Sequence, residues 1–232
     1  MPVESANPYT QMQLHLYELT ADMMNVENHR GHNANPDYWD ILVRDTESAY
    51  RDKVGLDFGC GCGRSLQNLW WRFRRMDGVD LSFGNLAHAH EHLVSVGCPA
   101  DRYQLFQANG VDLGNLASDE YDFVMSTIVL QHIAVYDIRF QYLQEFFRVM
   151  APGGLLSFQM GFGGGYGKAG YYENHYDTES TTSFHDTLVT HPGQIRADLE
   201  LIGFVDLWHT IRPSFDDGHP NWIYVKAYKP HA

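Results

Sequence analysis

The stretch Val54-Gly55-Leu56-Asp57-Phe58-Gly59-Cys60-Gly61-Cys62-Gly63-Arg64 decides the fold of this chain. A short apolar run ends in an acidic residue, and three glycines then alternate before a helix-like segment begins. Glycines at alternating positions remove the Cβ atoms that would hold a ligand away from the backbone, and they allow backbone angles closed to other residues. A strand that enters such a loop and then a helix N-terminus is how open α/β sheets hold a nucleotide-like ligand.

The composition of the chain is that of one globular domain. The 232 residues, of which 44% are hydrophobic, suffice for a complete α/β core. A formal net charge of -13 repels polyanions, so we expect neither nucleic acid nor an anionic membrane as a partner. The three cysteines form no disulfide framework, and we find no signal-peptide pattern and no membrane-spanning run. We therefore expect a cytoplasmic protein that is a monomer or a homodimer.

Hydrophobic patterning divides the chain into a helical part and an alternating part. Residues 9–24 and 37–49 favour helices, so residues 1–50 are expected to form an N-terminal helical cap. From residue 54 onward strands alternate with helices, which indicates a parallel sheet covered on both faces. The last two strands have no helix between them, which suggests an antiparallel pair. The expected strands are 54–58, 76–81, 103–107, 121–126, 155–160, 204–211 and 222–228.

These elements predict one α/β domain over residues 1–232, with a three-layer Rossmann-like fold. Its sheet is expected to have seven strands, mostly parallel, with an antiparallel C-terminal strand. The domain would consist of the helical cap, a cofactor-binding core at 54–160, an insertion at 161–187, and a last helix with the strand pair at 190–232.

Five separated motifs resemble those of class I S-adenosylmethionine-dependent methyltransferases, over roughly residues 54–160. The glycine loop from Asp57 to Gly63 resembles the family's first motif, and Asp80 ends the second expected strand, 21 positions after Gly59. The remaining motifs are Ala108-Asn-Gly-Val-Asp-Leu113, Asp122-Phe-Val-Met-Ser126 with Val129-Leu-Gln-His-Ile133, and Arg148-Val-Met-Ala-Pro-Gly-Gly154. Each motif alone is a weak signal, but their order and spacing together are specific.

The resemblance implies S-adenosyl-L-methionine as the cofactor and S-adenosyl-L-homocysteine as its product. It implies that the glycine loop lies under the methionine and ribose, and that the Asp80 carboxylate accepts hydrogen bonds from the ribose hydroxyls. Asn109 stands where the family usually has Asp, and its amide oxygen could accept from the adenine amino group. The expected cofactor-binding residues are Asp57, Gly59, Cys60, Gly61, Gly63, Asp80, Leu81, Asn109, Gly110, Val111, Ser126 and Trp39.

Other interpretations of these residues stay open. A dinucleotide-binding dehydrogenase would space its glycines as G-x-G-x-x-G, whereas the order here is G-x-G-x-G. Cys60 and Cys62 could bind a metal, but no second ligand pair accompanies them, so we expect no metal site. Trp39 could stabilise the sulfonium of the cofactor through its ring, or it could simply pack on the sheet.

The insertion at 161–187 is the expected acceptor site. It combines a glycine-rich run with a dense group of tyrosines, and it follows the fifth strand at the carboxyl edge of the sheet, where ligands bind in open α/β folds. We expect a lid that closes over the acceptor and excludes water; a surface loop without a role is the alternative. The expected substrate-binding residues are Tyr166, Tyr171, Asn174, His175 and Tyr176. The candidate catalytic residues are His185, His132 and Tyr172, because histidine can titrate near the operating pH and tyrosine can orient an acceptor.

The sequence therefore predicts an enzyme that methylates an O, N or C nucleophile of a small molecule by in-line displacement. A protein methyltransferase is one alternative, although a folded lid suits a macromolecular acceptor poorly. The other alternative is a non-catalytic module that binds S-adenosylmethionine and regulates a partner.

Overall fold

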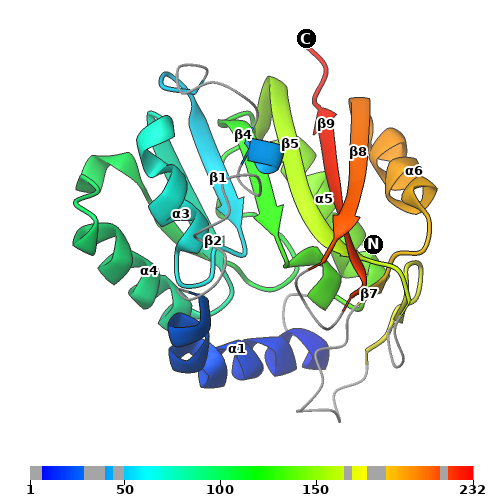
Figure 1. Ribbon diagram of the computed structural model, residues 1–232, viewed down its shortest axis with the longest axis horizontal. Coiled ribbons are helices and arrows are strands. Elements are labelled where there is room, and N and C mark those ends of the chain that lie inside the picture. Colours follow the sequence, from blue (N-terminus) through cyan, green and yellow to red (C-terminus); the bar gives the residue numbers. More distant parts are fainter. Residues whose placement is uncertain are drawn as a thin grey trace.

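The fold is built on one seven-stranded sheet with the order β3-β2-β1-β4-β5-β9-β8 (Figure 1). The computed structural model describes residues 7–28, 40–43, 50–164, 169–176, 187–214 and 219–231. Neighbouring strands from β3 to β5 pair in parallel, whereas β9 is antiparallel to both β5 and β8. The strands are β1 (Val54–Phe58), β2 (Arg75–Asp80), β3 (Leu105–Gln107), β4 (Tyr121–Thr127), β5 (Met150–Phe162), β8 (Val205–Pro213) and β9 (Asn221–Tyr228). The expected mostly parallel sheet with an antiparallel C-terminal strand is confirmed.

Helices cover both faces of the sheet, which gives the three layers predicted from the alternation. The helices are α3 (Arg64–Leu69) and α4 (Phe83–Ser95) on one face, and α5 (Tyr136–Val149) and α6 (Pro192–Ile202) on the other (Figure 1). Each face has its own apolar core, one containing Leu66 and Leu93, the other Phe146 and Leu199. Burial of both faces explains why apolar residues occupy consecutive positions in a parallel strand, as in Phe123-Val124-Met125 of β4.

Local capping residues fix where the helices begin and end. The Ser82 hydroxyl accepts from the Asn85 backbone N–H at the start of α4, as serine commonly does at a helix N-cap. Pro192 opens α6, and Gly203 ends it with a left-handed backbone, φ 113°. Short 3-10 turns, η2 (Trp70–Arg72), η3 (Ala100–Arg102) and η4 (Leu130–His132), connect other elements.

Several expected boundaries differ from the structure, among them those of α1, β3 and β5. The first helix, α1 (Pro8–Asn28), continues beyond the expected residue 24. β3 begins only at Leu105, because Tyr103 and Gln104, which follow η3, are not paired in the sheet. β5 begins at Met150, so that Pro152-Gly153-Gly154 lies within the strand. There Gly153 has φ +79° and its N–H donates to the Lys229 carbonyl at 3.0 Å, so the pairing continues through an irregularity.

The N-terminal part of the chain supplies a cap on the carboxyl edge of the sheet. α1 lies across the ends of the central strands (Figure 1). Of the second expected helix, 37–49, residues 40–42 are helical, and residues 44–49 lie outside the described part. Leu42 is buried, and its carbonyl accepts from the Ser157 hydroxyl on β5 at 2.8 Å. Among the described helices, none combines the length and the apolarity needed to span a bilayer.

Candidate cofactor and acceptor site

The glycine loop between β1 and α3 needs glycine for two separate reasons. Gly59, Gly61 and Gly63 all have left-handed backbones, with φ of 67°, 52° and 86°. A Cβ on Gly59 would lie 2.4 Å from Val129 Cγ2, and a Cβ on Gly63 would lie 2.9 Å from the Ala89 Cα. The loop is therefore fixed by conformation and by close packing, as the alternating glycines predicted.

Asp80 joins the end of β2 to this loop. Its buried carboxylate accepts from the backbone N–H of Gly61 at 2.8 Å, the backbone N–H of Ser82 at 2.9 Å, and the Asn85 side-chain amide at 3.1 Å. Burial raises the pKa of this carboxyl, and the three hydrogen bonds oppose that rise. Asp80 therefore positions the glycine loop, in addition to the ribose contact that the resemblance implies.

Asp57, at the end of β1, is a fully buried carboxyl group with neither oxygen in a well-formed hydrogen bond to a described residue. Burial raises its pKa to about 7, and the nearby Ser65 hydroxyl only partly offsets that cost. A buried acid without partners is available to a donor brought by a ligand, such as an ammonium group.

The raised pKa of Asp57 predicts how stability depends on pH. With a pKa of about 7, the folded state holds the Asp57 proton up to about pH 7, whereas the unfolded chain releases it near the ordinary aspartate pKa of 3.8. The folded state thus binds more protons within this window, and the free energy of unfolding falls as the pH rises toward 7, by up to about 1.4 kcal/mol per pH unit. Urea unfolding at pH 5, 6, 7 and 8 measures the slope. Asp57→Asn should flatten it, and an equal slope in both proteins would contradict the assignment.

The segment expected to contact adenine forms a tight turn. The Asn109 side-chain oxygen accepts from the backbone N–H groups of Val111 and Asp112, each at 2.9 Å, and its amide nitrogen donates to the Asp112 carboxylate at 2.8 Å. The oxygen that was expected to accept from adenine is therefore already engaged twice. Gly110, with φ +90°, packs against Thr10 of α1. Of the remaining expected positions, Leu81 follows β2, Ser126 lies near the end of β4, and Val111 lies in the turn after β3. The buried Ser126 hydroxyl has no hydrogen-bond partner among the described residues.

α1 brings residues to the site that the sequence did not identify. The Tyr9 hydroxyl accepts from the Ala134 backbone N–H at 2.8 Å and donates to the His132 carbonyl at 3.3 Å. Tyr9 is buried, which raises its pKa to about 12, so it stays protonated at neutral pH. Tyr9 lies three residues before Met12, so both lie on the apolar face of the expected helix. This spacing is the signal that could have identified Tyr9. For Glu18, on the same helix, the apolar spacing gave no such signal.

The insertion returns to this region at residues 173–176, which run alongside the loop after η4. The Tyr136 N–H donates to the Glu173 carbonyl at 3.0 Å, and the His175 N–H donates to the Ala134 carbonyl at 3.3 Å. The ring of Tyr176 meets the ring of Tyr9 edge-on, with centroids 6.1 Å apart. The structure thus brings His132, His175 and Tyr176 to the same wall of the carboxyl edge.

A buried arginine anchors this wall. Arg139 on α5 donates to the carbonyls of Ile133 and Tyr171 and to the Thr187 hydroxyl, and its guanidinium lies 4.8 Å from the centroid of the Tyr171 ring. Arg139 is only 1% exposed. The Tyr171 and Tyr136 hydroxyls in turn donate to Asp198 on α6 at 2.8 and 2.9 Å. We call Arg139, Tyr171, Tyr136, Thr187 and Asp198 the anchor cluster.

Three of the expected acceptor residues are occupied by contacts within the fold. Tyr171 belongs to the anchor cluster, and the Tyr172 hydroxyl donates to the Gln194 carbonyl on α6 at 3.3 Å. The Asn174 side-chain oxygen accepts from the Asp137 N–H at 2.9 Å and so caps the first turn of α5. These contacts favour a role in building the wall for all three. Trp39, Tyr166 and His185 lie outside the described residues.

The cysteines of the loop are packed within the protein. The Cys62 thiol contacts the Asn85 side-chain oxygen at 3.5 Å, and burial raises the pKa of both Cys60 and Cys62. Within the part of the chain that the structure describes, no three His, Cys, Asp or Glu side chains are grouped so as to hold a metal ion.

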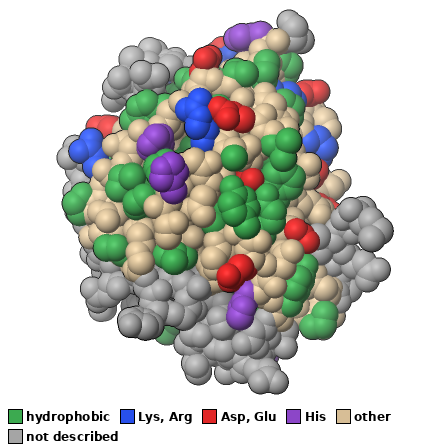
Figure 2. Space-filling model, turned by 90° about the vertical axis from the view of Figure 1, so that its right-hand side faces the viewer, with side chains coloured by type: hydrophobic (Ala, Val, Ile, Leu, Met, Phe, Trp, Pro, Cys, Tyr) green, Lys and Arg blue, Asp and Glu red, His purple; other side chains and the backbone are tan. Residues whose placement is uncertain are grey.

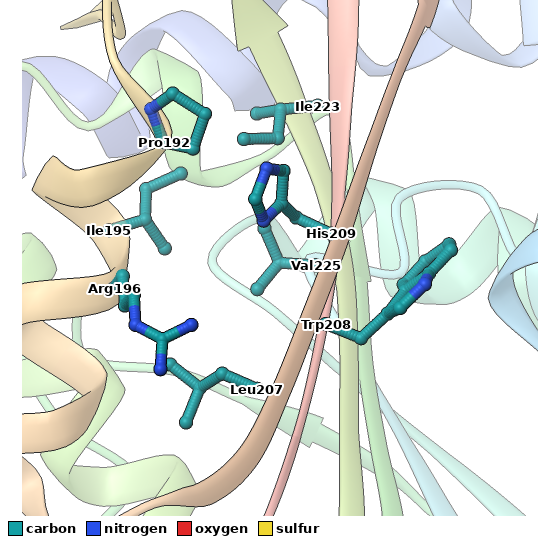
Figure 3. A pocket seen from close by; sticks show the side chains of 8 residues that line it. All are labelled: Pro192, Ile195, Arg196, Leu207, Trp208, His209, Ile223 and Val225. Atoms are coloured by element: carbon teal, nitrogen blue, oxygen red, sulfur yellow. The ribbon is translucent and has the colours of Figure 1, made fainter.

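A shallow groove lies elsewhere, between α6 and the β8–β9 edge of the sheet. The groove is lined by Pro192, Ile195, Arg196, Leu207, Trp208, His209, Ile223 and Val225. His209 and Val225 point toward α6, whereas Trp208 points away from it (Figure 3). Hydrophobic side chains also lie among charged ones on this side of the molecule (Figure 2). No expected site residue lines the groove, so we place the functional site at the carboxyl edge of the sheet.

The core of the chain matches a known family, and solved structures share its fold. Residues 56–158 match the family model described as a methyltransferase domain. No curated protein matches the sequence significantly. Two structures of phosphoethanolamine N-methyltransferase 2 from Haemonchus contortus are 20% and 19% identical, with TM-scores of 0.65 and 0.69 over 87% and 99% of this chain. The chain spans only 53% and 61% of their lengths.

Two further structures match over nearly the whole of both chains. Geranyl diphosphate C-methyltransferase from Streptomyces coelicolor is 13% identical, with a TM-score of 0.70 over 98% of this chain and 100% of its own. The cyclase SpnF is 15% identical, with a TM-score of 0.72 over 100% of this chain and 99% of its own. At these identities the structural matches show the fold, and the family model adds the motifs within it. Residues 56–158 therefore match a methyltransferase domain, within a fold that the chain shares with S-adenosylmethionine-dependent methyltransferases.

Proposed function

We propose that this enzyme transfers a methyl group from S-adenosylmethionine to an O, N or C nucleophile of a small molecule. The observation that carries the proposal is the arrangement at the carboxyl edge, where the glycine loop and Asp80 lie beside the wall formed by 132–136 and 173–176, with α1 across them. A site enclosed on these sides suits a small acceptor better than a protein side chain. The small-molecule methyltransferases among the structural matches support the same acceptor class.

The cofactor would supply an activated methyl group on its sulfonium, and the protein would bring the nucleophile into line with it. Asp80 would accept from the ribose hydroxyls, and the unpartnered Asp57 carboxyl would receive a donor from the methionine end. A hydroxyl acceptor needs a base. His132 and His175, on the wall, are candidates for it, and His185 is a candidate from the sequence. The insertion would complete an aromatic lid, to which Tyr176 and, from the sequence, Tyr166 would contribute.

Binding and transfer are tested in sequence. Isothermal titration with S-adenosylmethionine and S-adenosylhomocysteine tests the cofactor, and failure to bind either would overturn the proposal. Incubation with methyl-labelled cofactor and a fractionated cell extract then tests the acceptor. We expect label in the small-molecule fraction. Label in protein would identify the alternative acceptor class. Cofactor binding without any transfer would favour a regulatory module or a different reaction, since SpnF shows that this fold also supports a cyclase.

Asp80→Ala should raise the dissociation constant for S-adenosylmethionine about 10- to 100-fold. The substitution removes charge-assisted hydrogen bonds to ribose, worth about 1.5–3 kcal/mol, and it also leaves the Gly61 N–H without its acceptor. Titration calorimetry measures the change, and Asp119→Ala, which removes an exposed carboxylate on another part of the surface, is the control. An Asp80 variant with wild-type affinity would remove this residue from the cofactor site.

A further inference from the structure

α1 touches each of the segments that surround the proposed cofactor site. Near its N-terminus, Tyr9 bonds to Ala134 after β4, and Thr10 packs against Gly110 in the adenine segment. Further along, the Ala21 carbonyl accepts from the Cys62 thiol of the glycine loop at 3.8 Å. The helix thus crosses from one side of the site to the other. Asp80, which a ribose must reach, is only 9% exposed beneath it.

The C-terminal half of α1 is fastened to α4 by polar contacts. The Glu18 carboxylate accepts from the backbone N–H groups of Phe83 at 2.5 Å and Gly84 at 3.1 Å. These N–H groups belong to the first turn of α4, which has no carbonyl partner for them within the helix, and the positive end of the helix dipole favours a carboxylate there. The Asp22 carboxylate makes a second contact, with His88 Nε2 at 2.8 Å.

Glu18 therefore fixes α1 beside residues that are next in the chain to a partner of Asp80. The N–H groups that it accepts from follow directly after Ser82, whose own N–H binds Asp80. Glu18 makes no hydrogen bond to Asp80 or the glycine loop among the described residues, although its negative charge contributes to the raised pKa of the Asp80 carboxyl. Its hydrogen bonds go to the first turn of α4, so its main effect is on the placement of α1.

We infer that Glu18 is a positioning residue that holds α1 closed over the cofactor site and thereby sets how fast the cofactor enters and leaves. The inference rests on the proposed function, because it takes the covered site as the cofactor site. When the Glu18 contact is broken, α1 opens more often, and both the association rate and the dissociation rate rise together. The ratio of the two rates, and hence the affinity, stays nearly constant, because the contact between Glu18 and α4 is lost equally from the free and the bound protein.

The test is stopped-flow measurement of S-adenosylhomocysteine binding and release in the full chain, with calorimetry for the affinity. Glu18→Gln should raise both rates about tenfold, equivalent to about 1.4 kcal/mol in the opening equilibrium, and change the dissociation constant by less than about twofold. Glu200→Gln is the matched control, since it removes one carboxylate from an exposed ion pair on α6. Rates equal to wild type in Glu18→Gln, or rates equally raised in the control, would overturn the inference.

A second variant acts in the opposite direction. A Cβ on Gly84 would lie 3.0 Å from the Ala21 Cβ, and a small outward shift of α1 would bring the two atoms to the separation of about 3.5–4.5 Å found in disulfides. The oxidised double variant Ala21→Cys/Gly84→Cys should slow both the association and the dissociation of S-adenosylhomocysteine, and reduction should restore both rates. Mass spectrometry verifies that the two new cysteines pair with each other and not with the nearby Cys62. A rise in the dissociation rate alone in Glu18→Gln would instead assign Glu18 to cofactor binding and overturn the gate. Absence of binding by the wild-type chain would overturn the proposed function, and this inference with it.

Discussion

Gly63→Val should abolish cofactor binding and reduce the free energy of unfolding by about 2–5 kcal/mol. Two costs add. A side chain at φ +86° pays about 1–2 kcal/mol for a left-handed backbone. The new Cβ would lie 2.9 Å from the Ala89 Cα, which belongs to the backbone of α4 and cannot rotate away, and such overpacking costs about 1–3 kcal/mol. Relief requires α3 and α4 to separate, and this moves the loop that would hold the methionine and ribose.

Urea unfolding and titration calorimetry measure the two effects of Gly63→Val. Gly97→Ala is the matched control, because Gly97 has a similar backbone, φ +72°, but a Cβ there would meet nothing within 4 Å. Gly97→Ala should lose only the free energy that a left-handed backbone costs a side chain, and it should bind the cofactor with wild-type affinity. A Gly63 variant that is no less stable than the control would show that the contact with Ala89 is unimportant.

Arg139→Met should cost about 3–5 kcal/mol of stability, the usual penalty for breaking a buried charged network by removing one partner. The substitution leaves the Tyr171 carbonyl without its donor and the Ile133 carbonyl with the Thr187 hydroxyl alone, and it leaves Asp198 buried without its nearby positive charge. Because these carbonyls belong to the wall beside the acceptor, we also expect a large loss of methyl transfer with cofactor affinity retained.

Thermal and urea unfolding, calorimetry and the transfer assay together separate these effects of Arg139→Met. Arg196→Met is the control, since Arg196 pairs with Glu200 at an exposed site, where an ion pair contributes about 0–1 kcal/mol. If Arg139→Met behaved like this control, the anchor cluster would not hold the wall in place.

The parts of the fold that depend on local sequence were predictable. The glycine loop, the alternation of strands and helices, Ser82 as a cap and Gly203 as a helix end each follow from neighbouring residues. The start of β5 was not predictable, since Pro152-Gly153-Gly154 is typical of a helix end, and only pairing with the distant Lys229 shows that the strand begins earlier.

The candidate site likewise contains residues that local sequence identifies and residues whose role depends on the tertiary fold. Asp57 and Asp80 could be identified because each ends a buried strand, a position fixed by the local pattern. Asn109 could not be interpreted from sequence alone, because its role depends on whether its oxygen binds the turn or a ligand. Glu18, Tyr9 and Arg139 were not identified, since each acts on residues brought near only by the tertiary fold. The tyrosines of the insertion were recognised as a group, but the sequence could not show which of them face α6.

The contacts of α1 also affect how the protein matures during synthesis. Tyr9 and its partner Ala134 are separated by 125 positions, so the helix leaves the ribosome long before the loop that receives it. At about 5–20 residues per second, this delay is roughly 6–25 s. Until then α1 can contact only the earlier parts of its surface, the glycine loop and α4. We therefore expect the N-terminal end of α1 to dock last, so that a truncated nascent chain would carry a formed glycine loop that is only partly covered.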